Sequence, residues 1–164
     1  MSDLKQFLEL FNPYPGNTYL EISNGVSETT IALENLLSKV DGNLDLVIYS
    51  DEESDLKAKF PNSKIQQIND LSKPFRAMPR SADIVILKDF LHLHTNQDMI
   101  IKTAYTALAN TAEIIIMQKK GTMDIEKTYE MFERLEFRAA NYIDVLPEYD
   151  LVMAKKMHMW GNGL

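Results

Sequence analysis

The chain has 164 residues, of which 45% are hydrophobic and 25% are charged, a composition that suits one soluble domain with a single core. It contains no cysteine, so disulfides, thiolate metal ligands and cysteine nucleophiles are excluded. The formal net charge is -7, and we see neither a signal peptide nor an apolar run of membrane-spanning length, so we expect a cytoplasmic protein with no nucleic-acid or membrane partner.

The first half of the chain alternates segments of helical and strand character. Leu4, Phe7, Leu8 and Phe11 recur at helical spacing, and a proline-rich stretch ends that helix. Gly42 is a stop signal for the second helix. In chain order, we expect a helix over residues 4–11, a strand over 18–22, a turn over 23–25, a helix with its inner face over 33–40, a strand over 44–49, a helix from the acidic residues 51–53 to residue 60, and a weak strand over 65–68.

The second half begins with a loop and ends with two strands. Residues 69–81 hold two prolines and no apolar period, so they are expected to form a loop. Thr95 is expected to cap one helix, with Asp98 three residues later, and Asp124 to cap another. After the loop, in chain order, we expect a strand over 83–87, a helix with inward residues over 100–108, a strand over 113–117, a helix over 125–132, and strands over 139–145 and 151–156.

The connection between the last two strands decides the fold class. Residues 146–150 are too few to hold a crossover helix, so the last strand must run antiparallel. The strand–helix alternation before it predicts a parallel sheet with helices on both faces. We expect a single α/β domain over residues 1–164, with an N-terminal helix and loop over 1–16 and a C-terminal tail over 157–164.

With these elements in this order, the chain resembles the class I S-adenosylmethionine-dependent methyltransferase family. That family has a Rossmann-like, doubly wound, seven-stranded sheet in which a terminal hairpin inserts the last strand antiparallel. Its first motif is a strand that ends in an acidic residue, followed by a Gly-x-Gly-x-Gly turn. Here Glu21 matches the acidic position and Gly25 the middle glycine, while Ser23 and Ser27 replace the outer two.

The resemblance implies S-adenosylmethionine as the cofactor. Asp51 would accept hydrogen bonds from the ribose hydroxyls, although Tyr49 could occupy that register instead. Asn69 would bind the edge of adenine, and Lys88 would face the methyl-transfer position. The hydroxyl of Ser23 would bind the cofactor's carboxylate, unless the turn demands a positive φ there and strains the serine. The implied cofactor-binding residues are Glu21, Ser23, Asn24, Gly25, Asp51, Asn69, Asp70 and Lys88.

Methyl transfer from a sulfonium requires little from a protein beyond positioning the nucleophile in line with the sulfur–methyl bond. A general base helps when the acceptor carries a proton, and Asp89, His92 and His94 are the candidates. The implied partner is a small-molecule or protein acceptor. Because the chain has little beyond the core fold to shape an acceptor pocket, a second subunit could complete the site, which makes a homodimer one of the expected arrangements.

Other interpretations of the same residues remain open. The chain could be a non-catalytic relative that keeps the fold as a binding or interaction module. Residues 23–25 could be an ordinary turn, Asp51 a helix cap, and His92 and His94 a solvated or capping pair. His158 is the only other histidine, so we expect no metal site. A nicotinamide cofactor is disfavoured because Gly-x-Gly-x-x-Gly is absent after the first strand.

Overall fold

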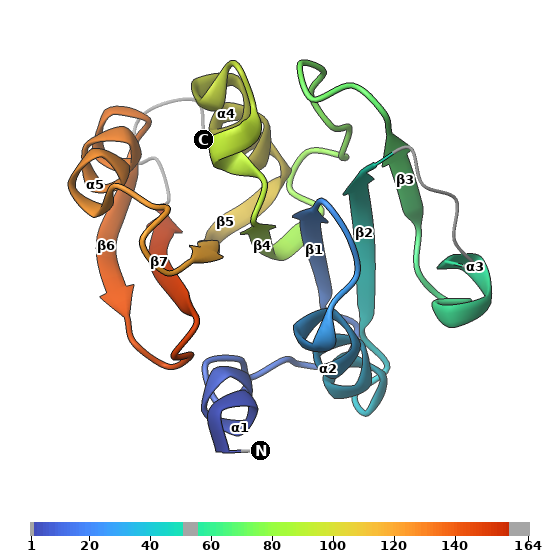
Figure 1. Ribbon diagram of the computed structural model, residues 1–164. Coiled ribbons are helices and arrows are strands. Elements are labelled where there is room, and N and C mark those ends of the chain that lie inside the picture. The colour runs from blue at the N-terminus through green and yellow to red at the C-terminus, as the bar shows by residue number, and fades with distance from the viewer. Residues whose placement is uncertain (1, 51–55, 158–164) are drawn as a thin grey trace.

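The computed structural model of the protein describes residues 2–50 and 56–157 (Figure 1). Helices and strands alternate through most of this length, as the sequence predicts. The elements in chain order are α1 (Ser2–Leu8), β1 (Thr18–Ser23), α2 (Glu28–Ser38), β2 (Asn43–Tyr49), α3 (Leu56–Lys59), β3 (Ile65–Ile68), β4 (Ala82–Lys88), the 3-10 helix η1 (Leu91–Leu93), α4 (Gln97–Ala107), β5 (Leu108–Lys119), α5 (Ile125–Arg134), β6 (Phe137–Ile143) and β7 (Tyr149–Lys156).

The strands form one seven-stranded sheet in the order β3-β2-β1-β4-β5-β7-β6. The first five strands pair in parallel, whereas β7 runs antiparallel to β5 and to β6. The terminal hairpin therefore inserts β7 between β5 and β6, which confirms the expected fold class. The order reverses direction at β1, beside β4, and that is where ligands bind in open sheets of this type.

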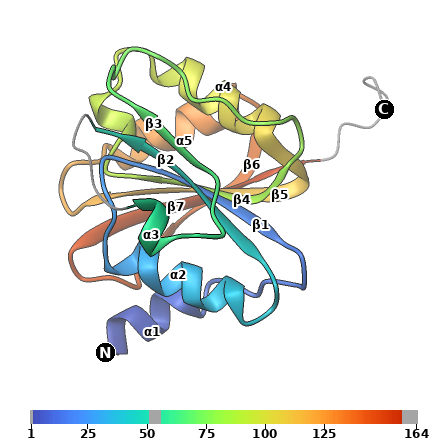
Figure 2. The ribbon, with the colours of Figure 1, turned by 90° about the vertical axis from the view of Figure 1, so that its right-hand side faces the viewer.

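Helices cover both faces of the sheet (Figure 2). On one face α4 and α5 bury Ile100, Ile101 and Phe132 against the sheet. On the other face α1, α2 and α3 form a second apolar core that includes Phe7 and Leu33. Because both faces are covered, β1 is buried along almost its whole length, and alternate residues of β1 point to opposite cores.

This alternation decides where the polar side chains of β1 lie. Leu20 and Ile22 belong to the core under α4 and α5, and Tyr19 belongs to the core under α2. Glu21 and Ser23 keep step with Tyr19, so they lie on the α2 side of the sheet. Both are fully buried, which makes them part of the sheet–helix interface rather than of the surface.

Most expected elements are confirmed, but several boundaries differ: α1 ends at Leu8 rather than at residue 11, and β6 spans Phe137–Ile143 rather than 139–145. Residues 69–81 contain no helix, as predicted. The cap of α4 is Asn96 rather than Thr95, because the Asn96 side chain accepts a hydrogen bond from the Met99 N–H. β5 begins at Leu108, well before the expected residue 113, and Thr111 within it has a φ of 68°. A positive φ at a threonine is a conformation that sequence propensity argues against.

Two further expectations about secondary structure concern segments that the structure does not describe. The start of the helix expected at the acidic residues 51–53 and the role of the tail after residue 157 both lie outside the described residues. Among the helices within residues 2–50 and 56–157, none combines the length and the apolar character needed to span a bilayer.

Candidate active site

The turn after β1 is held by the side chain of Ser23. Its hydroxyl donates to the carbonyl oxygen of Gly25 at 2.9 Å and accepts from the Gly25 N–H at 3.3 Å. Neither residue has a positive φ, so Ser23 stands in the family's glycine position without backbone strain. Ser27 is the N-cap of α2, and its N–H donates to Thr30 Oγ1 at 3.2 Å.

Gly25 is important for the space it leaves. A Cβ placed on Gly25 would meet no atom within 4 Å, since the residue faces an opening rather than a neighbouring element. The opening is a cavity of about 400 Å³, which we call the turn cavity. Its walls are residues 24–27, Lys88 and Asp89 at the end of β4, residues 92–93, and Lys119, Thr122 and Tyr149.

Lys88 and Asp89 form a buried pair on one wall of the turn cavity. Lys88 Nζ lies 3.4 Å from Asp89 Oδ2 and 5.3 Å from the centroid of the Tyr149 ring. The other carboxylate oxygen of Asp89 accepts from the backbone N–H of Lys119 at 2.9 Å. Asp89 therefore ties the end of β4 to the end of β5 and offsets the charge of Lys88, which leaves it little freedom to act as a general base.

Glu21 lies behind the turn, buried completely between β1 and α2. Thr30 Oγ1 donates to Glu21 Oε2 at 2.6 Å, whereas Oε1 has no hydrogen-bond partner within the described part of the chain. Burial raises the pKa of Glu21 to about 7, against the lowering effects of the Thr30 hydrogen bond and of Lys88. Glu21 does not line the turn cavity itself, so it acts on that cavity through its field rather than by contact.

His92 lies within the 3-10 helix η1 and His94 directly follows it, and their side chains have different surroundings. His92 is exposed and lines the turn cavity. His94 is 4% exposed, its Nδ1 accepts from the Asn96 N–H at 3.0 Å, and its ring packs edge-on against Phe90. His94 therefore has a structural role at the start of α4. Among the described residues, no group of three or more His, Asp or Glu side chains is arranged to hold a metal ion.

Asn69 and Asp70 do not line the turn cavity. Asn69 is exposed, and Asp70 Oδ1 accepts from the Ser72 N–H at 2.9 Å and from the Ser72 hydroxyl at 2.6 Å. These hydrogen bonds lower the pKa of Asp70. Asp51 lies outside the described residues. The structure thus gathers Asn24, Gly25, Lys88, Asp89 and His92 around one cavity, with Glu21 and Ser23 behind it and Asn69 and Asp70 after β3.

At the end of β2, Tyr49 takes part in packing rather than pointing into the turn cavity. Its ring stacks on Phe90 with centroids 4.2 Å apart, and its hydroxyl donates to the Lys73 carbonyl oxygen at 2.5 Å. Burial raises the pKa of Tyr49 to about 12, so the hydroxyl stays protonated and remains a donor. The alternative register in which Tyr49 meets the ribose therefore has no support from this arrangement.

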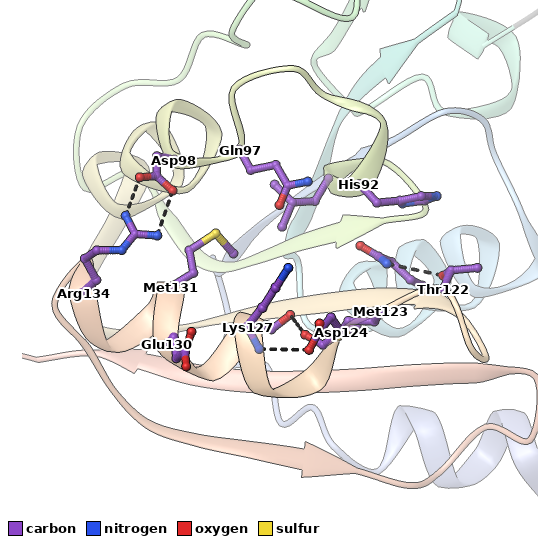
Figure 3. A pocket seen from close by; sticks show the side chains of 13 residues that line it. His92, Gln97, Asp98, Thr122, Met123, Asp124, Lys127, Glu130, Met131 and Arg134 are labelled. Carbon is purple, nitrogen blue, oxygen red and sulfur yellow. Dashed lines mark hydrogen bonds and ion pairs between the residues drawn. The ribbon is translucent and has the colours of Figure 1, made fainter.

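A second cavity, of about 440 Å³, lies between α4 and α5; we call it the helix cavity (Figure 3). Arg134 closes one end with a two-pronged ion pair to Asp98, which links the two helices. His92 and Thr122 stand at the other end. Because these two residues also line the turn cavity, the two cavities adjoin each other there.

Sequence reasoning missed three site residues: Thr122 in the loop between β5 and α5, Lys119 at the end of β5 and Tyr149 at the start of β7. Thr122 lines both cavities, and Lys119 and Tyr149 line the turn cavity. Gly121, with a φ of 86°, makes the turn that carries Thr122 inward. The pair Lys119–Lys120 followed by glycine was a signal for such a turn, but its charges alone indicate only a solvated surface.

Comparison with known proteins finds matches to the fold of the chain but none to its sequence. No family model matches the chain, and no curated protein matches its sequence. Solved structures do match. A S-adenosylmethionine-dependent methyltransferase from Aquifex aeolicus has 14% identity and a TM-score of 0.75, over 93% of this chain and 89% of the other.

Two longer proteins give similar matches. The carbon methyltransferase CurJ has 12% identity and a TM-score of 0.73, over 96% of this chain and 54% of the other. Phosphoethanolamine N-methyltransferase 2 of Haemonchus contortus, solved with S-adenosyl-L-methionine, has 12% identity and a TM-score of 0.74, over 95% of this chain and 52% of the other. The chain spans about half the length of these two proteins. It has the fold of the class I S-adenosylmethionine-dependent methyltransferases.

Proposed function

We propose that the chain is a methyltransferase that binds S-adenosylmethionine in and beside the turn cavity and transfers its methyl group to a small-molecule acceptor. The observation that carries this proposal is the open space at Gly25, at the carboxyl end of β1 where the strand order reverses. An unobstructed backbone at this turn is what a nucleoside ligand with a methionyl arm requires.

The residues present fit such a cofactor. A volume of about 400 Å³ lies within the range of small-ligand sites. The cofactor is a cation at sulfur, and the ionised form of the buried Glu21, which has an unsatisfied oxygen, favours positive charge nearby. Lys88 opposes it, but its charge is offset by Asp89 at 3.4 Å. The net field at this end of the sheet is therefore compatible with a sulfonium.

The sulfonium supplies an activated methyl group, so the protein's task is to orient the acceptor and to receive its proton. Of the three candidate bases, Asp89 is held by Lys119 and His94 by Asn96. His92 is exposed at the junction of the two cavities and is the candidate that can reach an acceptor. We infer that His92 takes the proton released when the acceptor is methylated.

We also propose roles for the residues implied by the family motifs that lie away from the turn cavity. Asp51 accepts hydrogen bonds from the ribose hydroxyls, and Asn69 and Asp70 lie at the adenine end. The Asp51→Ala variant should then bind S-adenosylhomocysteine at least tenfold more weakly than the wild type, whereas Glu52→Ala should not. Equal affinities for the two variants would remove Asp51 from the site.

The direct test of the function is calorimetric titration with S-adenosylmethionine and S-adenosylhomocysteine. We expect binding of both ligands in the micromolar range at one site per chain. No heat of binding at millimolar ligand would overturn the proposal and favour a module that keeps the fold without the cofactor. Methylation of added polypeptides would identify a protein acceptor. The sedimentation coefficient of the chain would identify a homodimer. Fractionation of the source cell would test the cytoplasmic location that we expect.

A further inference from the structure

Lys88 at the end of β4 is a buried cation that keeps hydrogen-bond donors for a ligand. The residue is 5% exposed, and lysine is almost never buried in this way without a partner. Within the described part of the chain its hydrogen bond is to Asp89 Oδ2, at a long 3.4 Å. Asp89 makes its shorter bond, of 2.9 Å, with the Lys119 N–H. Because an ammonium carries three N–H groups, two of them remain for a ligand.

Lys88 lies where two cavities meet. It lines the turn cavity and also a cavity of about 430 Å³ beside α1, which we call the α1 cavity. Ser27 and Tyr149 line both cavities as well. Lys88 Nζ lies 5.3 Å from the centroid of the Tyr149 ring. A molecule in the α1 cavity can therefore place one atom beside the Lys88 ammonium, next to the proposed cofactor site.

The walls of the α1 cavity favour an apolar ring. Leu4, Leu146 and Pro147 provide aliphatic surface, and Tyr149 adds an aromatic ring. Aromatic rings pack well against such a ring, and a volume of about 430 Å³ is within the range of small-molecule pockets. The body of a ligand in this cavity is therefore expected to be apolar and to contain a ring.

The other charged residues of the α1 cavity disfavour an anionic group on that body. They are Glu28, the first residue of α2, and Glu148, in the connection between β6 and β7. Both are exposed, so solvent weakens their effect. Neither forms an ion pair with a described residue. A ligand with a carboxylate or phosphate is repelled here, whereas an uncharged ligand is not.

The charges near Lys88 allow its ammonium to hold an oxygen that becomes negative. Asp89 brings one negative charge to the turn cavity, and Lys119 brings a second positive charge. Glu21 lies behind the turn, and burial raises its pKa to about 7, so near neutral pH it is only partly ionised. Positive charge is therefore not outweighed at this wall, and a sulfonium adds to it. An acceptor whose nucleophile becomes an oxyanion balances these charges.

We propose that the α1 cavity holds the methyl acceptor, that this acceptor is an uncharged molecule of the phenol class, and that Lys88 binds its hydroxyl oxygen. The assignment as an acceptor site rests on the proposed function. The hydroxyl must be acidic because the base, His92, is an imidazole, which is too weak a base for an ordinary alcohol. Lys88 is then a catalytic residue, since its N–H groups contact the reacting oxygen.

The proposed step is an O-methylation. The phenol hydroxyl gives its proton to His92, and its oxygen attacks the methyl carbon while Lys88 donates to that oxygen. The sulfur–carbon bond breaks, and its electron pair stays on sulfur. The products are a methyl ether, S-adenosylhomocysteine and a protonated imidazole, so atoms and charge balance.

The first test uses 4-nitrophenol, whose phenolate absorbs visible light that the phenol does not absorb. We expect the full wild-type chain, without cofactor, to increase the ionisation constant of the bound phenol about tenfold, because the Lys88 ammonium favours the phenolate. Absorbance at saturating protein over a series of pH values measures this constant. An unchanged ionisation constant, or no binding of 4-nitrophenol, would overturn the proposal.

Variants of Lys88 make the test specific. Lys88→Met keeps the apolar stem and should abolish the increase, whereas Lys88→Arg keeps a charged donor and should retain most of it. Lys102→Gln, an exposed change on α4 outside both cavities, should retain all of it. A wild-type increase in Lys88→Met contradicts the role of Lys88. If Lys88→Met does not fold, Lys119→Gln decides, because loss of the increase in that variant would assign the effect to the other lysine.

A matched pair of ligands tests the class of acceptor. We expect 4-hydroxybenzamide to bind about threefold more tightly than 4-hydroxybenzoate, because the carboxylate of the latter meets Glu28 and Glu148 across solvent. Calorimetry of both ligands measures the ratio, and Glu148→Gln should reduce it. Tighter binding of 4-hydroxybenzoate would show that the acceptor is not an uncharged molecule.

A parallel titration with S-adenosylhomocysteine separates this inference from the proposed function. If that ligand fails to bind while 4-nitrophenol ionises through Lys88, the phenol site stands and its role as an acceptor site falls. If S-adenosylhomocysteine binds and Lys88→Met leaves the ionisation of 4-nitrophenol unchanged, the proposed function stands and this inference falls.

Discussion

Glu21 combines complete burial with an oxygen that no described group satisfies. Burial raises its pKa to about 7, while in the unfolded chain the value is 4.5. Between these pH values the folded protein keeps a proton that the unfolded chain has lost. The free energy of unfolding therefore falls as pH rises from 4.5 through 7, by about 3 kcal/mol at most, and stays low above pH 7.

The Glu21→Gln variant tests this dependence. Glutamine cannot ionise, so we expect the variant to lose the decline and to gain stability relative to the wild type between pH 5 and pH 8. Urea unfolding at the two pH values measures the difference. Glu126→Gln, an exposed change on α5, serves as the control and should keep the wild-type slope. The same slope in Glu21→Gln would show that another group controls the pH dependence.

For a substitution at Gly25 we predict an effect on cofactor binding rather than on stability. A leucine at this position would extend into the turn cavity without meeting the rest of the protein, since its Cβ has nothing within 4 Å. We expect Gly25→Leu to weaken S-adenosylhomocysteine binding at least tenfold while changing the free energy of unfolding by less than about 1 kcal/mol. Calorimetry and urea unfolding measure the two quantities. Asn35→Leu, on the exposed side of α2, should leave both unchanged; equal binding in the two variants would contradict the prediction.

At this scale the sequence indicates the positions of the motif but not what each side chain does. The resemblance to the methyltransferase family implies Glu21, Ser23 and Gly25 as residues of the site. The structure turns the Ser23 hydroxyl onto the Gly25 backbone and buries Glu21 behind the turn. Whether a hydroxyl faces a ligand or its own backbone depends on a difference of one rotamer, which no residue spacing encodes.

Among the elements, α4 depends on a side chain from the far end of the chain. Lys156 on β7 is 7% exposed, and its Nζ donates to the carbonyl oxygens of Tyr105 at 2.7 Å and Leu108 at 2.8 Å. These carbonyls lie at the carboxyl end of the helix, where backbone acceptors lack partners and a cation is favoured. Lys156 therefore caps α4 across the sheet.

The Lys156→Met variant should lower the free energy of unfolding by about 2 kcal/mol, since it keeps the apolar stem and removes both charge-assisted hydrogen bonds. The neighbouring Lys155→Met is a matched control. Lys155 is exposed, so its loss should cost no more than about 0.5 kcal/mol. Urea unfolding of both variants gives the comparison. Similar losses would mean that Lys156 contributes through general charge rather than through its contacts with α4.

Element types followed from the sequence more reliably than element ends. The period of apolar residues depends on local geometry, and it predicted α4, while the short connection over residues 146–150 predicted the terminal hairpin. The ends depend on contacts with other elements. β5 starts at Leu108 because it pairs with Ala82 of β4, and the register then shifts before Ile84. Asn96 caps α4 while His94 holds its N–H, a pairing set by where η1 places the histidine.

For the whole molecule, both cavities lie between segments that are far apart in the sequence. The turn cavity draws on residues from 24 to 149, and the helix cavity on residues from 91 to 134. The order of strands decides which segments meet at the carboxyl edge of the sheet, and the turn after β1 is one of them. The junction at His92 and Thr122 depends on how two loops pack, so it emerges from the assembled fold.

Because the turn cavity exists only when these segments are assembled, a ligand bound there stabilises the entire fold. At a concentration 100 times its dissociation constant, S-adenosylhomocysteine should raise the free energy of unfolding by about 2.7 kcal/mol. For a chain of this length that corresponds to an increase of roughly 5–10 °C in Tm. Thermal unfolding followed by circular dichroism, with and without ligand, measures the increase. Because Gly25→Leu is expected to bind at least tenfold more weakly, at the same ligand concentration it should show no more than about half of this increase, and an increase as large as that of the wild type would mean that the ligand binds elsewhere.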